Sequence, residues 1–137
     1  MKKFNSVMVI DDDDTSNFIC EMLVRKSNIS ENLYLMKNGK EAIDFINENC
    51  RSTQNRNMEK MCPDLIFLDL NMPVMDGLEF LAEIYSNTAI NIKQTKIYML
   101  TSSENPEDIN KVIKYNVQGY INKPMTDDKL VELLSTI

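Results

Sequence analysis

Four short runs of consecutive apolar residues constrain the fold of this chain more than any other feature. The runs are Val7–Ile10, Leu33–Met36, Leu65–Leu68 and Ile97–Leu100, and a weaker one covers 119–121. Because each run is continuous and does not alternate with polar residues, it predicts a strand covered on both faces. Such strands are typical of a parallel sheet.

Segments with helical spacing follow each run and predict helices that cover the sheet. Their apolar positions, in chain order, are Phe18, Ile19, Met22 and Leu23; Ala42, Ile43 and Ile46; Leu78, Leu81, Ala82 and Tyr85; Ile109, Val112 and Ile113; and Leu130, Leu133, Leu134 and Ile137. Asp14 or Thr15 is placed to cap the first helix, and Pro106 suits the first turn of the fourth. Five strand–helix alternations predict a doubly wound α/β fold with right-handed crossovers.

The length of 137 residues fits one domain. Polar segments at 51–62 and 87–94 predict surface loops, and neither is long enough to be a linker. The last helical pattern runs to Ile137, so we expect residues 1–137 to form one domain without an output domain.

Charge and hydropathy argue against two kinds of partner. The formal net charge of −6, from 15 Lys+Arg and 21 Asp+Glu, disfavours binding to nucleic acid, which requires a basic patch. No apolar run reaches the roughly 18 residues of a membrane span, and the N-terminus carries no separate apolar signal region with a cleavage site. We therefore expect a cytoplasmic protein without a membrane or nucleic-acid partner.

The chain has three cysteines and no histidine. Cys20, Cys50 and Cys62 are odd in number and widely spaced, which predicts reduced thiols in the cytosol and neither a disulfide framework nor a zinc site. Without histidine, the chain has no Ser-His-Asp triad, no His metal ligand and no phosphohistidine of its own. Its chemistry must therefore depend on carboxylates, hydroxyls and lysines.

Polar residues follow the predicted strands at the point where a parallel sheet binds ligands, beyond the carboxyl ends of its strands. Asp11–Asp14 follow the first run, Asp69 the third, Thr101 the fourth and Lys123 the fifth. If the first and third strands are neighbours, about 4.8 Å apart, the carboxylates that follow them converge.

Convergence of Asp11, Asp12 and Asp69 predicts a metal site. Two carboxylates about 4 Å apart repel by roughly 4 kcal/mol at an effective dielectric constant near 20. A hard divalent cation removes that repulsion, and Mg²⁺ is typically held by one or two carboxylates together with waters and phosphate oxygens. We expect Mg²⁺ here, or alternatively Mn²⁺, whereas Asp13 and Asp14 are expected to cap a helix.

Lys123 and Thr101 complete the predicted constellation. The lysine can pair with Asp69 and then with an anion carried by Asp69. The threonine can donate its hydroxyl to the same anion. Each residue alone is common at a strand end, so the prediction depends on their convergence.

Four segments resemble the receiver domain of bacterial two-component response regulators. They are VMVIDDDDTSN, PDLIFLDLNMPVMDGLEFL, KIYMLTSS and GYINKP, in the family's order, and they cover essentially the whole chain. The Asp-x-x-Met-Pro-x-Met-Asp-Gly pattern is the most specific part. The resemblance implies a flavodoxin-like (βα)5 fold with strand order 2-1-3-4-5. It also implies a phosphoacceptor switch in a phosphorelay, which is not a conventional enzyme.

The resemblance implies a role for each acidic residue. Asp69 is the implied phosphoacceptor, and it binds Mg²⁺ together with Asp11, Asp12 and the backbone carbonyl of Asn71.

The resemblance also assigns the residues around the phosphoryl group. Lys123 is expected to contact its oxygens, and the bond from Lys123 to Pro124 is usually cis in this family. Thr101 is the implied switch hydroxyl, and Tyr120 is the aromatic residue that turns when Thr101 moves. Gly77 is expected to open the third helix.

The implied partners are a histidine kinase or phosphotransfer protein, which supplies the phosphoryl group, and a downstream protein that binds the 106–137 face. Ser102 and Ser103 follow the switch threonine. Ser102 replaces a commoner small apolar residue of the family, and Ser103 is short and neutral at a position that can tune dephosphorylation. The loops at 51–62 and 87–94 are longer than in minimal members of the family. These departures leave the phosphoryl lifetime and the choice of partner open.

Three other interpretations compete with a receiver domain. A haloacid-dehalogenase-like phosphatase fits Asp11-x-Asp13-x-Thr15, with Asp11 as nucleophile and Asp13 as acid/base, but it leaves the segment from Asp69 to Gly77 unexplained. A flavin-binding flavodoxin is not supported, because no Gly-rich or Ser/Thr-rich phosphate loop follows the first predicted strand of this chain. A receiver domain that serves only as a constitutive protein-interaction module is not indicated either, because the acidic residues, Thr101 and Lys123 are all present.

Overall fold

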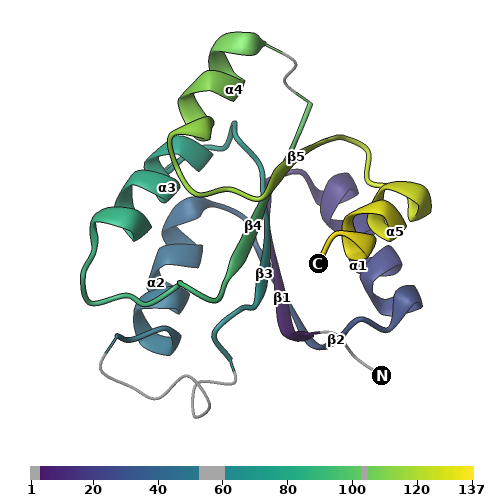
Figure 1. Ribbon diagram of the computed structural model, residues 1–137, viewed down its shortest axis with the longest axis horizontal. Helices are drawn as coiled ribbons and strands as arrows, with labels where there is room; N and C mark the ends of the chain where they lie inside the picture. The colour runs from purple at the N-terminus through teal and green to yellow at the C-terminus, as the bar shows by residue number, and fades with distance from the viewer. Residues whose placement is uncertain (1–3, 53–60, 103–104) are drawn as a thin grey trace.

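Within residues 4–52, 61–102 and 105–137, which the computed structural model describes, five parallel strands form one sheet (Figure 1). The strands are β1 (Phe4–Ile10), β2 (Ser30–Met36), β3 (Leu65–Leu68), β4 (Lys96–Thr101) and β5 (Gly119–Asn122). Their order is β2-β1-β3-β4-β5. The fold therefore confirms the predicted doubly wound α/β architecture and its strand order.

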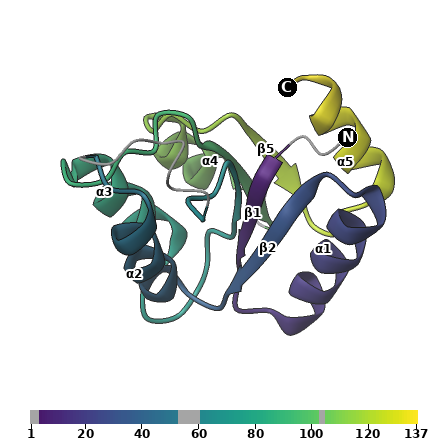
Figure 2. The same cartoon turned by 90° about the horizontal axis from the view of Figure 1, so that it is seen from below.

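Helices cover both faces of this sheet, as Figures 1 and 2 show. They are α1 (Asp14–Ser27), α2 (Gly39–Asn49), α3 (Gly77–Ser86), α4 (Pro106–Ile113) and α5 (Asp127–Ser135). Helices α1 and α5 lie on one face, and α2, α3 and α4 lie on the other. No helix in the described part of the chain is both long enough and apolar enough to cross a membrane.

Each face of the sheet has its own buried apolar cluster. Met8 and Ile10 of β1 pack with residues of α2, α3 and α4, whereas Val7 and Val9 pack with residues of α1 and α5. Successive side chains of a strand point to opposite faces. The apolar runs of β1, β3 and β4 are continuous because both faces of these strands are covered. In the edge strand β2, by contrast, Leu35 is exposed.

Three strands begin before their apolar runs, β4 by one residue, and only one of the residues expected to cap α1 does so. Strands β1 and β2 begin three residues before their apolar runs. At the β2 edge of the sheet, Asn32 pairs with Ser6 while its side chain stays exposed, so polar residues extend the strand. The N-cap of α1 is Asp13, whose side chain accepts a hydrogen bond from the Thr15 amide at 3.0 Å. The expectation that Asp13 caps the helix is confirmed, whereas neither Asp14 nor Thr15 caps it.

The predicted loop at 87–94 pairs with the segment that follows α2. Arg51 and Ile90 form an isolated antiparallel bridge between the two segments. The predicted loop at 51–62 is described only at its ends, because 53–60 lie outside the described residues.

Cys50 and Cys62 form a disulfide, so the prediction of three reduced thiols is wrong for this pair. Cys50 is the C-cap residue of α2 and Cys62 precedes β3, with Cα atoms 5.1 Å apart and both residues buried. The chain returns from α2 into the sheet beside the end of that helix. This return brings together two cysteines that their spacing alone does not pair.

Cys20 is a free thiol buried in the cluster beneath α1 and α5. Burial raises the pKa of this thiol to about 12, and the nearby charge of Asp11 adds to the effect. The thiolate form, which is the reactive form, is therefore scarce at neutral pH.

Thiol titration tests these cysteine assignments. In protein purified without reductant, we expect no rapid reaction of the native state with Ellman's reagent at pH 8, because Cys20 is buried and protonated. Denaturation without reductant should expose Cys20 alone, and a Cys20→Ser control should then show no thiol at all. Reaction of Cys50 and Cys62 in the unreduced, denatured protein would contradict the disulfide.

Candidate functional site

The carboxyl ends of the strands bring the predicted site residues to one edge of the sheet. Asp11 follows β1, Asp69 follows β3, Thr101 ends β4 and Lys123 follows β5. Strand register places Ile10 beside Leu68, so Asp11 and Asp69 lie side by side. It also places Thr101 beside Asn122, the residue before Lys123.

Asp11, Asp12 and Asp69 form an acidic cluster. One carboxylate oxygen from each lies within 4.8 Å of the others. Asp11 and Asp69 are buried, with 1% and 6% of their surface exposed, whereas Asp12 is exposed. Two of the three carboxylates are therefore buried, and that of Asp12 is exposed to solvent.

Lys123 supplies the positive charge of this site. Its ammonium lies 2.7 Å from Asp11 Oδ2 and 3.4 Å from Asp69 Oδ2. Burial opposes the charged form of Lys123, but the hydrogen bond to Asp11 and the charges of Asp69 and Asp11 outweigh it and raise its pKa. One ammonium against three carboxylates leaves the cluster with excess negative charge.

The donor set of the cluster fits a hard divalent cation. Asp11 Oδ1 accepts a hydrogen bond from the Asp13 amide at 3.0 Å. Asp11 Oδ2 is buried and, among the described residues, receives no hydrogen bond of ordinary geometry beyond its close ion pair with Lys123. Carboxylate oxygens with spare acceptor capacity are the ligands that Mg²⁺ and Mn²⁺ prefer. Asp11, Asp12 and Asp69 are thus the residues that would hold the ion.

Residues 7–135 match the family model of the response regulator receiver domain. The chain belongs to this family. Among its relatives, response regulator Rcp1 from Synechocystis is 27% identical over 131 residues, which cover 96% of this chain and 84% of that protein.

Solved structures of response regulators share the fold of this receiver domain. A two-component response regulator from Cytophaga hutchinsonii gives a TM-score of 0.81 at 28% identity, over 98% of this chain and 97% of that one. The Mn(2+)-bound form of Rcp1 gives 0.73 at 26% identity, over 97% and 91%. The phosphorylated cyanobacterial phytochrome response regulator RcpA gives 0.74 at 25% identity, over 97% and 90%.

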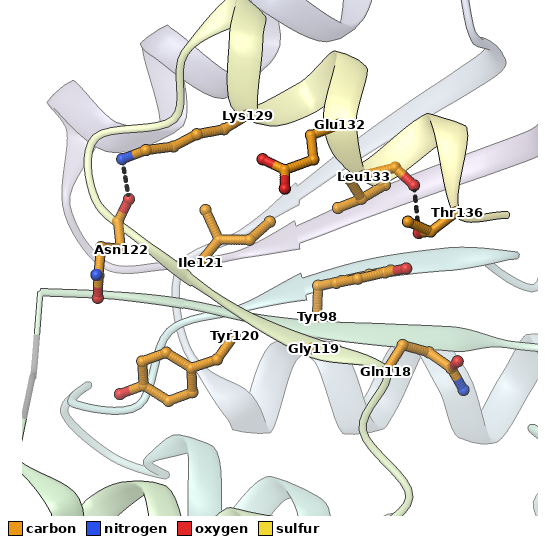
Figure 3. A pocket seen from close by; sticks show the side chains of 10 residues that line it. All are labelled: Tyr98, Gln118, Gly119, Tyr120, Ile121, Asn122, Lys129, Glu132, Leu133 and Thr136. Carbon is orange, nitrogen blue, oxygen red and sulfur yellow. Dashed lines mark hydrogen bonds between the residues drawn. The ribbon is translucent and has the colours of Figure 1, made fainter.

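The receiver residues Thr101 and Tyr120 lie on neighbouring strands. Thr101 is fully buried at the end of β4, and its carbonyl accepts a hydrogen bond from the Lys123 amide at 3.0 Å. Tyr120 is half-buried and packs against the cluster beneath α2, α3 and α4. Figure 3 shows its ring on the side of β5 opposite Ile121. The roles of these two residues as a switch pair stay predictions.

The loops around Asp69 and Lys123 have the expected backbone. The Lys123–Pro124 bond is cis, and Gly77 is the first residue of α3. A Cβ on Gly77 would lie 2.5 Å from the main-chain oxygen of Asp69, so only glycine lets α3 start this close to the site. Asn71 is exposed two residues after Asp69, and its role as a carbonyl ligand stays a prediction.

Sequence reasoning missed Asn17. This residue is buried in α1, and its side-chain amide donates to the main-chain oxygen of Asp11 at 2.8 Å. It therefore ties α1 to the strand end that carries the acidic cluster. The available signal was a polar residue within the apolar stripe that Cys20 and Val24 continue at helical spacing.

Burial and neighbouring charge disfavour ionised Asp69 in the metal-free receiver. Burial is the larger cause and the charge of Asp11 is the next; together they raise the pKa of Asp69 from 3.8 to about 6, although Lys123 opposes them. The folded state thus prefers the protonated carboxyl more strongly than the unfolded state does.

This preference predicts that Asp69→Asn stabilises the metal-free protein. The ionised carboxylate destabilises the fold at pH 7.5, so its neutral isostere should raise the free energy of unfolding by up to about 3 kcal/mol in EDTA. The gain should shrink as pH falls below about 6 and vanish below about 3.8, where both states are protonated. Urea unfolding across this pH range measures it. Asp13→Asn is the matched control, because asparagine caps a helix as well as aspartate does. Equal stability of wild type and Asp69→Asn at pH 7.5 would refute this electrostatic account.

Proposed function

We propose that this receiver domain accepts a phosphoryl group on Asp69 from a phosphohistidine of a histidine kinase or phosphotransfer protein. The supporting observation is the buried Asp69 carboxylate beside Asp11, Asp12 and the Lys123 ammonium. The family match makes the chain a signalling switch of two-component systems. Cytoplasmic location and action without an attached output domain stay predictions.

The proposed transfer is an in-line substitution at phosphorus. A carboxylate oxygen of Asp69 forms the new P–O bond, the P–N bond to the donor imidazole breaks, and the imidazole leaves with the electron pair of that bond. Phosphoryl transfer depends mainly on positioning and on neutralising charge. Lys123 contributes to that neutralisation because its ammonium already lies 3.4 Å from Asp69 Oδ2. Slow hydrolysis of the acyl phosphate by water resets the switch.

The proposed metal ion is Mg²⁺, held by Asp11, Asp12 and Asp69 and by the Asn71 carbonyl. When bound, the ion neutralises charge on the phosphoryl oxygens and on the carboxylates. A relative, Rcp1, has been solved with Mn(2+) bound, which supports a divalent cation at this site.

A cavity of about 310 Å³ lies beside Lys123. The start of α1 forms one wall, and Ser102 and the segment Lys123–Met125 form the others. It offers the donor an approach beside the acidic cluster. Ser103, which sequence reasoning linked to dephosphorylation, lies outside the described residues.

Thr101 and Tyr120 would couple phosphorylation of Asp69 to a change in the partner-binding face. Phosphorylation adds about −1.5 to −2 charges and three acceptor oxygens, toward which the Thr101 hydroxyl moves. Tyr120 then turns inward and alters the affinity of the 106–137 face for a downstream protein. A shift from 1:99 to 99:1 requires about 5.5 kcal/mol of differential stabilisation.

The phosphatase interpretation is not favoured. The chain matches the receiver family over 7–135. In addition, Asp13, the acid/base of that alternative, is engaged as the N-cap of α1.

Labelling with acetyl phosphate in the presence of Mg²⁺ tests the proposal. We expect wild type and Asp13→Asn to form the aspartyl phosphate, whereas Asp69→Asn forms none and Asp11→Asn is at least about tenfold slower, since one metal ligand is lost. Intact mass and peptide mapping measure the extent and position of labelling. A phosphoryl group on Asp11, or undiminished labelling of Asp69→Asn, would rule the proposal out.

NMR of the same proteins tests the switch pair. Beryllofluoride, a phosphoryl analogue, should shift the Tyr120 ring signals in wild type. In Thr101→Ala that shift should shrink. If it is as large as in wild type, Thr101 and Tyr120 are not coupled.

A further inference from the structure

Lys129 of α5 binds the loop that carries Lys123. Its ammonium donates hydrogen bonds to the main-chain oxygens of Asn122 at 2.8 Å and Pro124 at 3.1 Å. Figure 3 shows its side chain reaching from α5 to Asn122 along the wall of a cavity of about 480 Å³ between β5 and α5. The two carbonyls belong to the residues directly before and after Lys123.

The contacts of Lys129 differ from those of an ordinary surface lysine. Its side chain is half-buried, and within the described ranges its ammonium contacts carbonyl oxygens and no carboxylate. Glu132 lines the same cavity but forms no ion pair with it there. Hydrogen bonds from an ammonium are stronger than those between neutral groups. The loop is therefore held by a charged donor fixed to a helix.

This loop is also anchored by main-chain hydrogen bonds and by the buried side chain of Met125, which packs in the cluster beneath α1 and α5. The Lys123 amide donates to the Thr101 carbonyl at 3.0 Å, which ties the loop to the end of β4. On the α5 side, the Thr126 hydroxyl accepts from the Lys129 amide at 3.2 Å and caps the helix. Between these two points, the Lys129 ammonium holds the carbonyls on both sides of Lys123.

We propose that Lys129 is a positioning residue that holds Lys123 where its ammonium contacts Asp11 and Asp69. Lys129 touches none of the reacting groups and acts through the backbone of the Asn122–Pro124 segment. Its functional consequence rests on the proposed function, because Lys123 is the residue expected to bind the phosphoryl oxygens. Loss of Lys129 should weaken binding of a phosphoryl group and leave the carboxylates in place.

The test compares binding of Mg²⁺ alone with binding of beryllofluoride in saturating Mg²⁺, both by calorimetry. For Lys129→Met, we expect beryllofluoride affinity to fall about tenfold while Mg²⁺ affinity stays unchanged or rises, because Lys123 competes less for the carboxylates. Lys129→Arg keeps donors for both carbonyls and should restore affinity. Lys26→Met is the matched control, because it removes another lysine contact of α5, the 3.1 Å ion pair with Asp127, and should bind like wild type.

A double-mutant cycle separates positioning from a general structural effect. If Lys129 acts through Lys123, then Lys123→Met and the double variant Lys123→Met/Lys129→Met should bind beryllofluoride equally weakly. Additive losses, or wild-type affinity in Lys129→Met, would overturn the proposal for Lys129 alone. Failure of wild type to bind beryllofluoride with Mg²⁺ would instead overturn the proposed function. If Lys129→Met does not fold, Lys129→Gln replaces it, and its single amide should give a smaller loss.

Discussion

Repulsion among carboxylates at one sheet edge is the constraint on which the rest of this structure depends. Asp11 and Asp69 are buried close together, and a single ammonium, that of Lys123, does not balance them. Burial strengthens electrostatic interactions, favourable and unfavourable alike. The protein thus retains an unfavourable charge arrangement that a bound divalent cation would relieve.

The surrounding structure holds these charges in place against that repulsion. The Asn17 amide binds the main chain of Asp11, and the absence of a side chain at Gly77 lets α3 begin against the main chain of Asp69. Lys129 holds both sides of Lys123. Each anchor acts on the main chain of a charged residue or of its neighbours, which leaves the charged side chains available to ligands.

The sequence predicted most of the fold because a strand that is buried on both faces consists of consecutive apolar residues. The run Leu65–Leu68 is wholly buried, and four continuous runs together indicated a parallel sheet. Convergence of Asp11 and Asp69 was predicted on the condition that the first and third strands are neighbours, an adjacency that only the resemblance to receiver domains implied. The Cys50–Cys62 disulfide and the bonds of Lys129 were not predictable in this way, because they depend on how the chain returns between elements and not on periodicity. Asn17 was missed for a related reason, since its partner is a main-chain oxygen.

Stability of the wild-type receiver domain in urea at pH 7.5, measured over a Mg²⁺ titration, tests the central claim most directly. An ion that binds the folded state alone raises the free energy of unfolding by about 2.7 kcal/mol at one hundred times its dissociation constant. We predict a saturable rise of this kind in wild type that requires at least about tenfold more Mg²⁺ when Asp12 is replaced by alanine, because one metal ligand is lost. A free energy of unfolding that does not respond to Mg²⁺ in wild type, or that responds equally in Asp12→Ala, would contradict the account.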